Sequence, residues 1–268
     1  MKITNLLILL TAITMGSFGI ASYCFKNSNV DKTQIAKAFQ MQFDNSNDLE
    51  EVKEDLDLPA EQVESIEVHS VNTHIVFYSD EGKDVRVKFK AKTGDKNGKI
   101  FKYSLEDKNL KIDLVDESLK KSFFIQWDDE NIKGGEAGPE LKVYVPKDLK
   151  RVKINNVNGE LKIKQLNIAD LKVEIVSGGV RIEDVKSDSI SVSQVSGDAK
   201  LVKVQSPNIE VNSVSGNVRI EVASEEEYNF KIQTMSGQIR NELGSPENAK
   251  GKMKIVSVSG DIKITRTH

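Results

Sequence analysis

The chain has 268 residues, of which 38% are hydrophobic and 29% are charged, which is enough for one substantial domain with appendages. Its 38 basic and 41 acidic side chains give a formal net charge of −3, so the composition does not favour a nucleic-acid partner or an acidic tail. Because Cys24 is the only cysteine, an internal disulfide is excluded.

Residues 1–25 have the composition of an export segment, with Lys2 followed by a long uncharged run. Such a run is typical of a signal peptide, here cleaved after about Ala21. It is also just long enough for an uncleaved anchor that contacts the membrane through residues 6–25. Cys24 adds lipidation as a third option, although the three residues before it depart from the usual lipobox. In every case we expect the bulk of the chain to be exported, as a periplasmic, cell-surface or membrane-anchored protein.

Residues 26–58 are predicted to form a polar, partly helical linker. Segments 31–43 and 47–59 place apolar side chains near helical spacing, and Pro59 would end the second helix. Two alternatives stay open for this region: a spacer or cover on the first repeat, and a mobile linker. The folded domain is expected to span residues 59–268.

Residues 59–150 are expected to form irregular strands of that same domain. Apolar and polar side chains alternate strictly over residues 84–91, which is typical of a strand with one buried face. Segments 99–105 and 109–115 form a predicted hairpin, and residues 140–146 lead into a region of regular repeats.

The segment 150–268 is built from six copies of a short repeat such as "VNSVSGNVRI", each with a glycine at the same place. The steps between these glycines are 19, 19, 19, 21 and 23 residues, and a fixed period of about 20 is the signature of a repeat architecture. A seventh, degenerate copy spans residues 68–77 and has Thr73 in the glycine position. The six glycines are Gly159, Gly178, Gly197, Gly216, Gly237 and Gly260.

Counted from the glycine, positions −7, −5, −2 and +2 are apolar in every copy. The spacing of two predicts strands, and the spacing of three between −5 and −2 predicts one reversal of the inward face just before the Ser-Gly corner. The pattern therefore predicts an all-β fold: a single-stranded β-solenoid, or β-helix, with rungs of about 20 residues that stack into one core. A sandwich of hairpins is the alternative. We expect the row Val173, Val192, Val211, Ile232 and Ile255 to stack on consecutive rungs.

Position +3 after the glycine carries a cation in all six copies, and it lies between two inward positions, so it should face solvent. Stacking would bring these cations about 5 Å apart. Acidic residues at +1 and +5 would offset part of their repulsion. One interpretation is a charged face that keeps the protein soluble and resists sideways pairing, and the other is an anion-binding face. The six cations are Lys162, Arg181, Lys200, Arg219, Arg240 and Lys263.

The sequence contains no recognisable catalytic or metal-binding constellation. His69, His74 and His268 are scattered, and no nucleophile, zinc or phosphate-loop motif is present. The Ser-Gly serines have no base beside them at a repeating position, so they are expected to be corner residues. We therefore expect no enzyme activity, no cofactor and no metal.

The tandem "VSGGVRI", "VSGDAKL", "VSGNVRI", "MSGQIR" and "VSGDIKI", preceded by "LKVYVPKDLKRVKI", resembles the bacterial putative adhesin family over residues 60–268. The resemblance implies an exported or membrane-anchored β-solenoid of largely unknown function, and it carries over no catalytic residue.

These observations favour an exported, non-catalytic interaction module. Its partner would be an envelope polysaccharide, a lipid or a surface protein. A structural protein that pairs through its terminal rung is the main alternative, and a carbohydrate-active enzyme is a weaker one, because no repeat position supplies clustered carboxylates.

Overall fold

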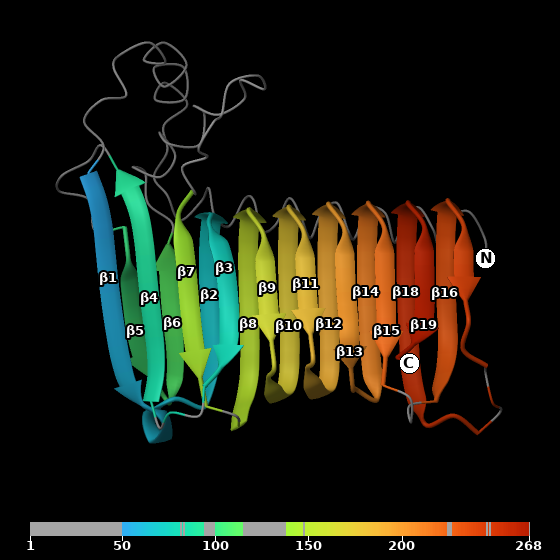
Figure 1. The fold of residues 1–268 in the computed structure, drawn as a ribbon, viewed down its shortest axis with the longest axis horizontal. Coiled ribbons are helices and arrows are strands. Elements are labelled where there is room, and N and C mark those ends of the chain that lie inside the picture. The colour runs from blue at the N-terminus through green and yellow to red at the C-terminus, as the bar shows by residue number, and fades with distance from the viewer. Residues whose placement is uncertain are drawn as a thin grey trace, which may run out of the picture.

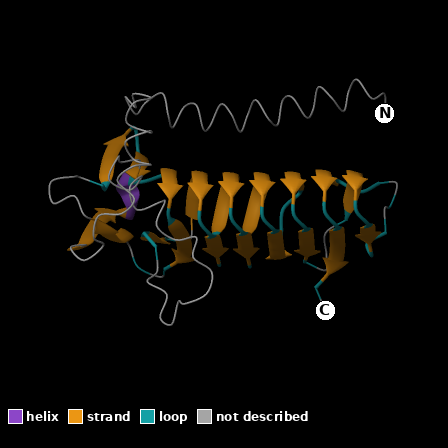
Figure 2. Cartoon of the chain, turned by 90° about the horizontal axis from the view of Figure 1, so that it is seen from above, coloured by secondary structure: helices purple, strands orange, loops and turns teal. Residues whose placement is uncertain are grey.

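The computed structural model describes residues 50–80, 82, 84–93, 100–114, 138–146, 148–223, 227–244, 246 and 248–267. These residues form two sheets that face each other along one long stack (Figures 1 and 2). The short 3-10 turn η1 (Ala60–Gln62) is the one helical element of the described residues. The prediction of an all-β fold with parallel strands in stacked layers is thus confirmed.

The ten-stranded sheet, called sheet A, has the order β1 (Glu50–Pro59), β4 (Asp84–Thr93), β7 (Glu140–Val145), β3 (His74–Ser79), β9 (Leu161–Lys164), β11 (Val180–Glu183), β13 (Ala199–Val204), β15 (Val218–Val222), β19 (Ile262–Arg266) and β17 (Ile239–Asn241). The nine-stranded sheet, called sheet B, has the order β16 (Tyr228–Ser236), β18 (Gly251–Ser259), β14 (Asn208–Ser215), β12 (Lys186–Ser196), β10 (Asn167–Ser177), β8 (Asp148–Asn158), β2 (Ser65–Asn72), β6 (Asn109–Leu114) and β5 (Lys102–Glu106).

Each Ser-Gly corner joins a strand of sheet B to a strand of sheet A, so one repeat contributes one strand to each sheet. Val192 pairs with Val173 and with Val211, so these neighbouring rungs are offset by 19 residues. At the corner Gly197 has a φ of 120°, a conformation that residues with a side chain rarely adopt. A Cβ atom there would lie 2.1 Å from the carbonyl oxygen of Gly178 on the rung below, so the stack itself requires glycine.

The core lies between the sheets and consists mainly of aliphatic side chains at the alternating inward positions, with Phe77, Phe89 and Tyr228 among them. The prediction that position −2 faces inward is wrong. Val195 and Val214 at −2 are half-buried, whereas Gln194 and Ser213 at −3 are buried. Alternation therefore continues to −3 and reverses at the corner itself. The polar residue is accommodated because the Gln194 amide donates hydrogen bonds to the carbonyl of Gly197 and to the hydroxyl of Ser213.

The last two rungs are exchanged in space relative to their order in the chain. Val211 pairs with Ile255 on β18, and Ile255 pairs in turn with Ile232 on β16. The five residues of the predicted inward row are aligned, but their predicted consecutive order is wrong beyond Val211. Figure 1 shows β18 and β19 between β14–β15 and the terminal strand β16. The two longer steps of 21 and 23 residues provide the extra chain for this crossover.

The opposite end of the stack contains antiparallel strands. β1 pairs along its whole length with β4. β5 pairs with β6, which confirms the predicted hairpin of segments 99–105 and 109–115. The expectation of a helix over 47–59 is wrong from Glu50 onward. Val52, Leu56 and Leu58 fit the two-residue period of a strand, and Leu56 lies opposite Val87 of β4. The degenerate copy behaves as predicted: Asn72, beside Thr73, pairs with Asn158, beside Gly159.

The expectations for residues 1–25, for segment 31–43 and for Cys24 lie outside the described residues. In the part of the chain that is described, no helix is long and apolar enough to cross a membrane.

Candidate binding face

The six cations at position +3 lie in one unbroken row across sheet A, here called the cation row. Each pairs in register with the next along the stack, and neighbouring strands of a sheet are about 4.8 Å apart. Because of the rung exchange, Lys263 lies between Arg219 and Arg240. The spatial order is Lys162, Arg181, Lys200, Arg219, Lys263 and Arg240.

Three members of the row form ion pairs with glutamates close to them in the sequence. They are called the flanking cations here: Lys162, Arg181 and Arg240. The Lys162 Nζ lies 3.0 Å from Glu160, and the Arg240 Nε lies 2.7 Å from Glu242. Arg181 donates a hydrogen bond of 2.6 Å from Nε to the carboxylate of Glu183.

The carboxylates of two of these pairs titrate at lower pH than isolated ones. The hydrogen bond from Lys162 lowers the pKa of Glu160. The hydrogen bond from Arg181 lowers the pKa of Glu183, which Lys164 also contacts. Near neutral pH these glutamates therefore stay ionised and neutralise their cations.

The other three members are consecutive along the stack. They are called the central cations here: Lys200, Arg219 and Lys263. Arg219 is exposed, and Lys200 and Lys263 are half-buried. Within the described part of the chain, none of the three forms an ion pair. Among the described residues, neighbouring acids therefore form ion pairs with the flanking cations and not with the central ones.

The acidic residues at position +1 of the Lys200 and Lys263 rungs, Asp198 and Asp261, have another role. Asp198 Oδ1 accepts a hydrogen bond of 2.7 Å from the backbone N–H of Asn217 on the next rung. Asn217 Oδ1 accepts one from the N–H of Asp261, and Asp261 Oδ1 accepts one from the N–H of Gln238. These +1 side chains tie consecutive corners together, so the carboxylates of Asp198 and Asp261 are held at the corner instead of pairing with the cations.

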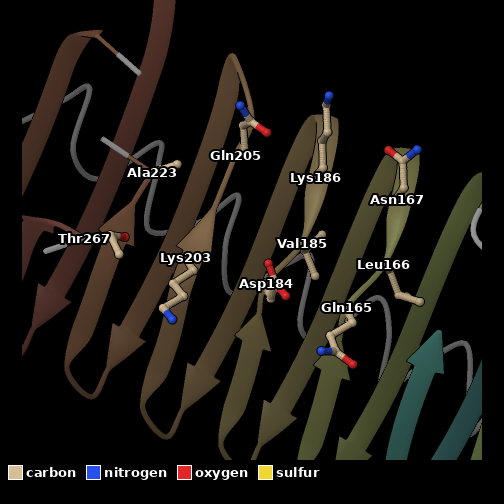
Figure 3. A pocket seen from close by; sticks show the side chains of 10 residues that line it. All are labelled: Gln165, Leu166, Asn167, Asp184, Val185, Lys186, Lys203, Gln205, Ala223 and Thr267. Carbon is tan, nitrogen blue, oxygen red and sulfur yellow. The ribbon is translucent and has the colours of Figure 1, made fainter. Parts of the chain in front are cut away.

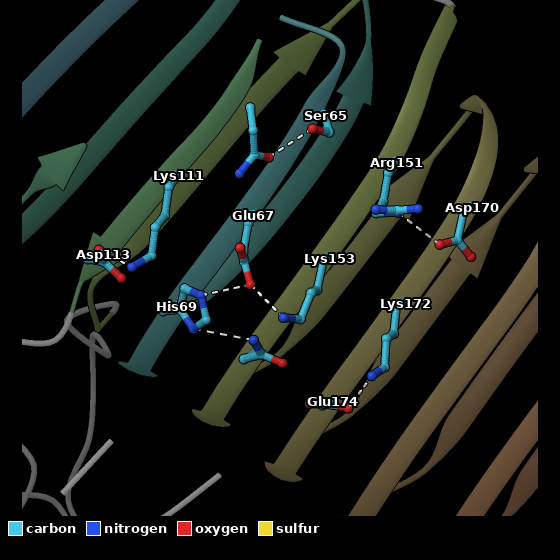
Figure 4. Close-up of polar contacts among 12 residues, drawn as sticks. Ser65, Glu67, His69, Lys111, Asp113, Arg151, Lys153, Asp170, Lys172 and Glu174 are labelled. Carbon is cyan, nitrogen blue, oxygen red and sulfur yellow. Dashed lines mark hydrogen bonds and ion pairs between the residues drawn. The ribbon is translucent and has the colours of Figure 1, made fainter. Parts of the chain in front are cut away.

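The outer face of sheet B, in contrast, is largely neutralised by ion pairs (Figure 4). Lys153 contacts Glu67 at 2.6 Å, and Lys172 contacts Glu174 at 2.8 Å. Arg151 pairs with Asp170, and Lys111 pairs with Asp113. The two faces of the stack thus differ in how much positive charge they leave for a ligand.

His69 belongs to this sheet B network. Its ring lies 3.0 Å from Glu67 and 3.2 Å from Asn155, and burial lowers the pKa of the ring. Burial also raises the pKa of Glu67, but hydrogen bonding and charge from Lys153 and His69 outweigh this and leave that pKa below its usual value. His74 is exposed at the next corner, where its Nδ1 accepts a hydrogen bond from the N–H of Glu160.

A hollow of about 510 Å³ lies on the far side of the stack from the Ser-Gly corners, along the return turns (Figure 3). Gln165, Asp184 and Lys203 occupy equivalent positions in three successive turns with φ of 57°, 54° and 53°. Asp184 is the single carboxylate in the lining, which provides no acid–base pair for hydrolysis. The lining residues are Gln165, Leu166, Asn167, Asp184, Val185, Lys186, Lys203, Gln205, Ala223 and Thr267.

The structure extends the cation row beyond the residues singled out in the sequence. Val76 of β3 pairs with Lys162 on one side and with Lys142 on the other, and Lys142 pairs with Lys88 of β4. Lys142 and Lys88 each stand between two buried apolar residues, which was the available signal. Their alignment with the repeats could not be read from the sequence because β4 and β7 lie outside the 19-residue period.

The model of the family described as Toastrack DUF4097 matches residues 31–265 of the chain. A comparison with functionally curated proteins gives no match.

Among solved structures, the chain is similar to a "putative cell adhesion protein" from Clostridium sporogenes ATCC 15579, with 14% identity, coverage of 81% of this chain and 100% of that chain, and a TM-score of 0.48. A "putative adhesin" from Bacteroides fragilis NCTC 9343 has 13% identity, coverage of 81% and 97%, and a TM-score of 0.44. A "putative lipid binding protein" from Parabacteroides distasonis ATCC 8503 has 13% identity, coverage of 81% and 97%, and a TM-score of 0.31.

Proposed function

The chain belongs to the Toastrack DUF4097 family, and we propose that it is an exported, envelope-associated and non-catalytic interaction module that binds an anionic polymer on the outer face of sheet A. The ligand class is a linear envelope polysaccharide with repeated negative charges. It lies along the cation row, across the strands and parallel to the axis of the stack.

The observation that carries this proposal is the unpaired state of the central cations. Lys200, Arg219 and Lys263 stand on adjacent strands without an ion pair to any described residue. Like charges on neighbouring strands repel one another. An incoming anion relieves that repulsion without first displacing a carboxylate. The flanking cations would have to give up a glutamate to bind the same ligand, so we expect them to contribute less.

The geometry also favours a polymer over a small anion. The cations of the row are exposed or half-buried, and they repeat at the strand spacing of about 4.8 Å. None of them lines a pocket of the described residues. Each exposed charge contact is worth less than about 1 kcal/mol, so useful affinity requires several contacts at once. Binding of this kind is steered by the positive face and is screened by salt.

The experiment is a titration of the full-length protein with a polyuronate, a linear polysaccharide with one carboxylate per sugar, at low and at about 150 mM salt. We expect binding at low salt that weakens at the higher salt. The variant K200Q/R219Q/K263Q should lose most of it. A control with the same change in net charge, K153Q/K172Q/K254Q on sheet B, should retain it.

Other outcomes separate the ligand classes. Equal losses in the two variants would show a nonspecific attraction, and no binding by the wild type at low salt would overturn the proposal. Binding to vesicles with anionic headgroups but not to the polyuronate would show that the ligand of this face is a lipid instead of a polysaccharide. If gel filtration shows that the polymer becomes shorter during incubation with the protein, the non-catalytic assignment is contradicted.

A further inference from the structure

The two ends of the stack differ in how their sheet edges are protected. At one end the outermost strands are β1 and β5, and at the other they are β17 and β16. Figure 1 shows β1 and β16 at opposite ends of the molecule. Any edge strand presents unpaired backbone N–H and C=O groups that can pair with another chain, unless charges or proline block it.

The end formed by β16 and β17, here called the terminal rung, leaves core positions open. Ile239 continues the inward row of Ile262, yet it is 46% exposed while Ile262 is 1% exposed. Phe230 and Ile232, at two further inward positions, are only partly covered, and Met235, at the outward position −2, is 55% exposed. Two of the three exposed large hydrophobic residues of the described chain therefore lie on this rung. The core is unfinished there, as it would be if one more rung were missing.

The edge strands at the opposite end carry more charge than those of the terminal rung. β1 carries four carboxylates within residues 51–57, at Glu51, Glu54, Asp55 and Asp57, and it ends at Pro59. β5 carries Lys102 and Glu106 among its five residues. β16 has one charged residue in nine, Lys231, and β17 adds only Arg240. Charges and proline on an edge strand oppose pairing, so the terminal rung is the edge that remains open to it.

We propose that two copies of this chain associate end to end through their terminal rungs, with β16 of one copy antiparallel to β16 of the other. A two-fold axis across the stack brings sheet B of both copies into one continuous sheet and covers Ile239 and Met235.

The sequence of β16 suits pairing with itself. Ile232 is the middle residue of Tyr228–Ser236, so antiparallel pairing about the centre of the strand places Ile232 opposite its counterpart. Lys231 then faces Gln233 of the second copy, and the two lysines are not directly opposite, which avoids the penalty for like charges. Arg240 brings its own counter-ion, Glu242, to the interface. This inference is independent of the proposed ligand.

The test uses site-directed cross-linking of the full-length chain in mild detergent, in a Cys24→Ser background. Gln233→Cys on β16 should give a covalent dimer with a short bismaleimide. Ser104→Cys on β5, the sheet B edge at the other end, is the matched control and should stay monomeric. M235K/I239K should abolish the dimer in sedimentation while the monomer keeps the circular-dichroism spectrum of the wild type, whereas Tyr103→Lys should leave the dimer unchanged.

Three results would overturn the inference. A monomeric wild type, together with a maleimide-reactive thiol in the Gln233→Cys variant, would show that the edge stays open. A monomer in which that thiol resists maleimide would show that the edge is already covered within the single chain. Cross-links between the Gln233→Cys and Ser104→Cys variants in a mixture of the two would show head-to-tail association instead.

Discussion

At Gly197, a single hydrogen in place of a side chain determines whether two rungs can stack. Its φ is 120°, and a Cβ at this position would lie only 2.1 Å from the Gly178 carbonyl oxygen, so alanine cannot fit without movement of the backbone. We predict that Gly197→Ala lowers the free energy of unfolding by more than about 1 kcal/mol. Gly244→Ala, with no atom within 4 Å of its Cβ, is the control and should change it little. Denaturant unfolding of both variants provides the comparison, and equal stabilities would contradict the corner geometry.

A substitution at Val211 provides a second test at the level of a single residue, in this case of the row of inward-facing side chains. Its side chain is fully buried between Val192 and Ile255, so Val211→Asp would place an unpaired carboxylate in the core. We predict a loss of several kcal/mol in the free energy of unfolding. Asn212→Asp, one residue further on the outward face, adds the same charge and should cost far less. An unchanged melting temperature for the first variant would count against a core at this row.

At the scale of the strands, the exchange of the last two rungs can be tested by disulfides between exposed corner serines. Ser215 pairs with Ser259, and Ser259 pairs with Ser236, so Ser215 and Ser236 are separated by a whole rung. Neighbouring strands at about 4.8 Å fit the Cα separation of a disulfide, whereas twice that distance does not. In a Cys24→Ser background, S215C/S259C should therefore oxidise readily and S215C/S236C should not. The reverse result would restore the sequential order.

Much of the fold could be predicted from the sequence because the repeat fixes which residues lie in one row. The order of the rungs could not, since a row containing Val211, Ile232 and Ile255 is equally apolar in either order. The steps of 21 and 23 residues were the only signal of a crossover. The strand at 50–59 was missed because Leu49, Val52 and Leu56 satisfy a helical spacing, while Val52, Leu56 and Leu58 satisfy the strand period. Pairing with β4 decides between the two.

The positions of the cations in the candidate site could be predicted from the sequence, but which of them form ion pairs could not. The period alone places six cations in one row. Whether Asp198 pairs with Lys200 or with the backbone N–H of Asn217 depends on the corner geometry, which the sequence pattern does not contain. The division into central and flanking cations therefore required the structure.

At the scale of the whole molecule, the export prediction concerns residues 1–25. We expect the native protein outside the cytoplasm after cell fractionation. N-terminal sequencing of that fraction should then give either a new terminus just after Ala21 or the intact start of a retained anchor. Recovery of the native chain from the cytoplasm alone would contradict the assignment of an envelope ligand as well.

The central claim is that the cation row binds through its unpaired centre, and two variants that each remove three cations from the same face test it most directly. K200Q/R219Q/K263Q removes the central cations, and K162Q/R181Q/R240Q combined with E160Q/E183Q/E242Q removes the flanking cations together with their glutamates, so that no bare carboxylate faces the ligand. With affinity for a linear polyuronate measured at low salt, we predict a loss of about tenfold to a hundredfold for the first variant. The second should lose clearly less, because it removes pairs that are already neutral. An equal loss in both variants, or a larger one in the second, would contradict the account.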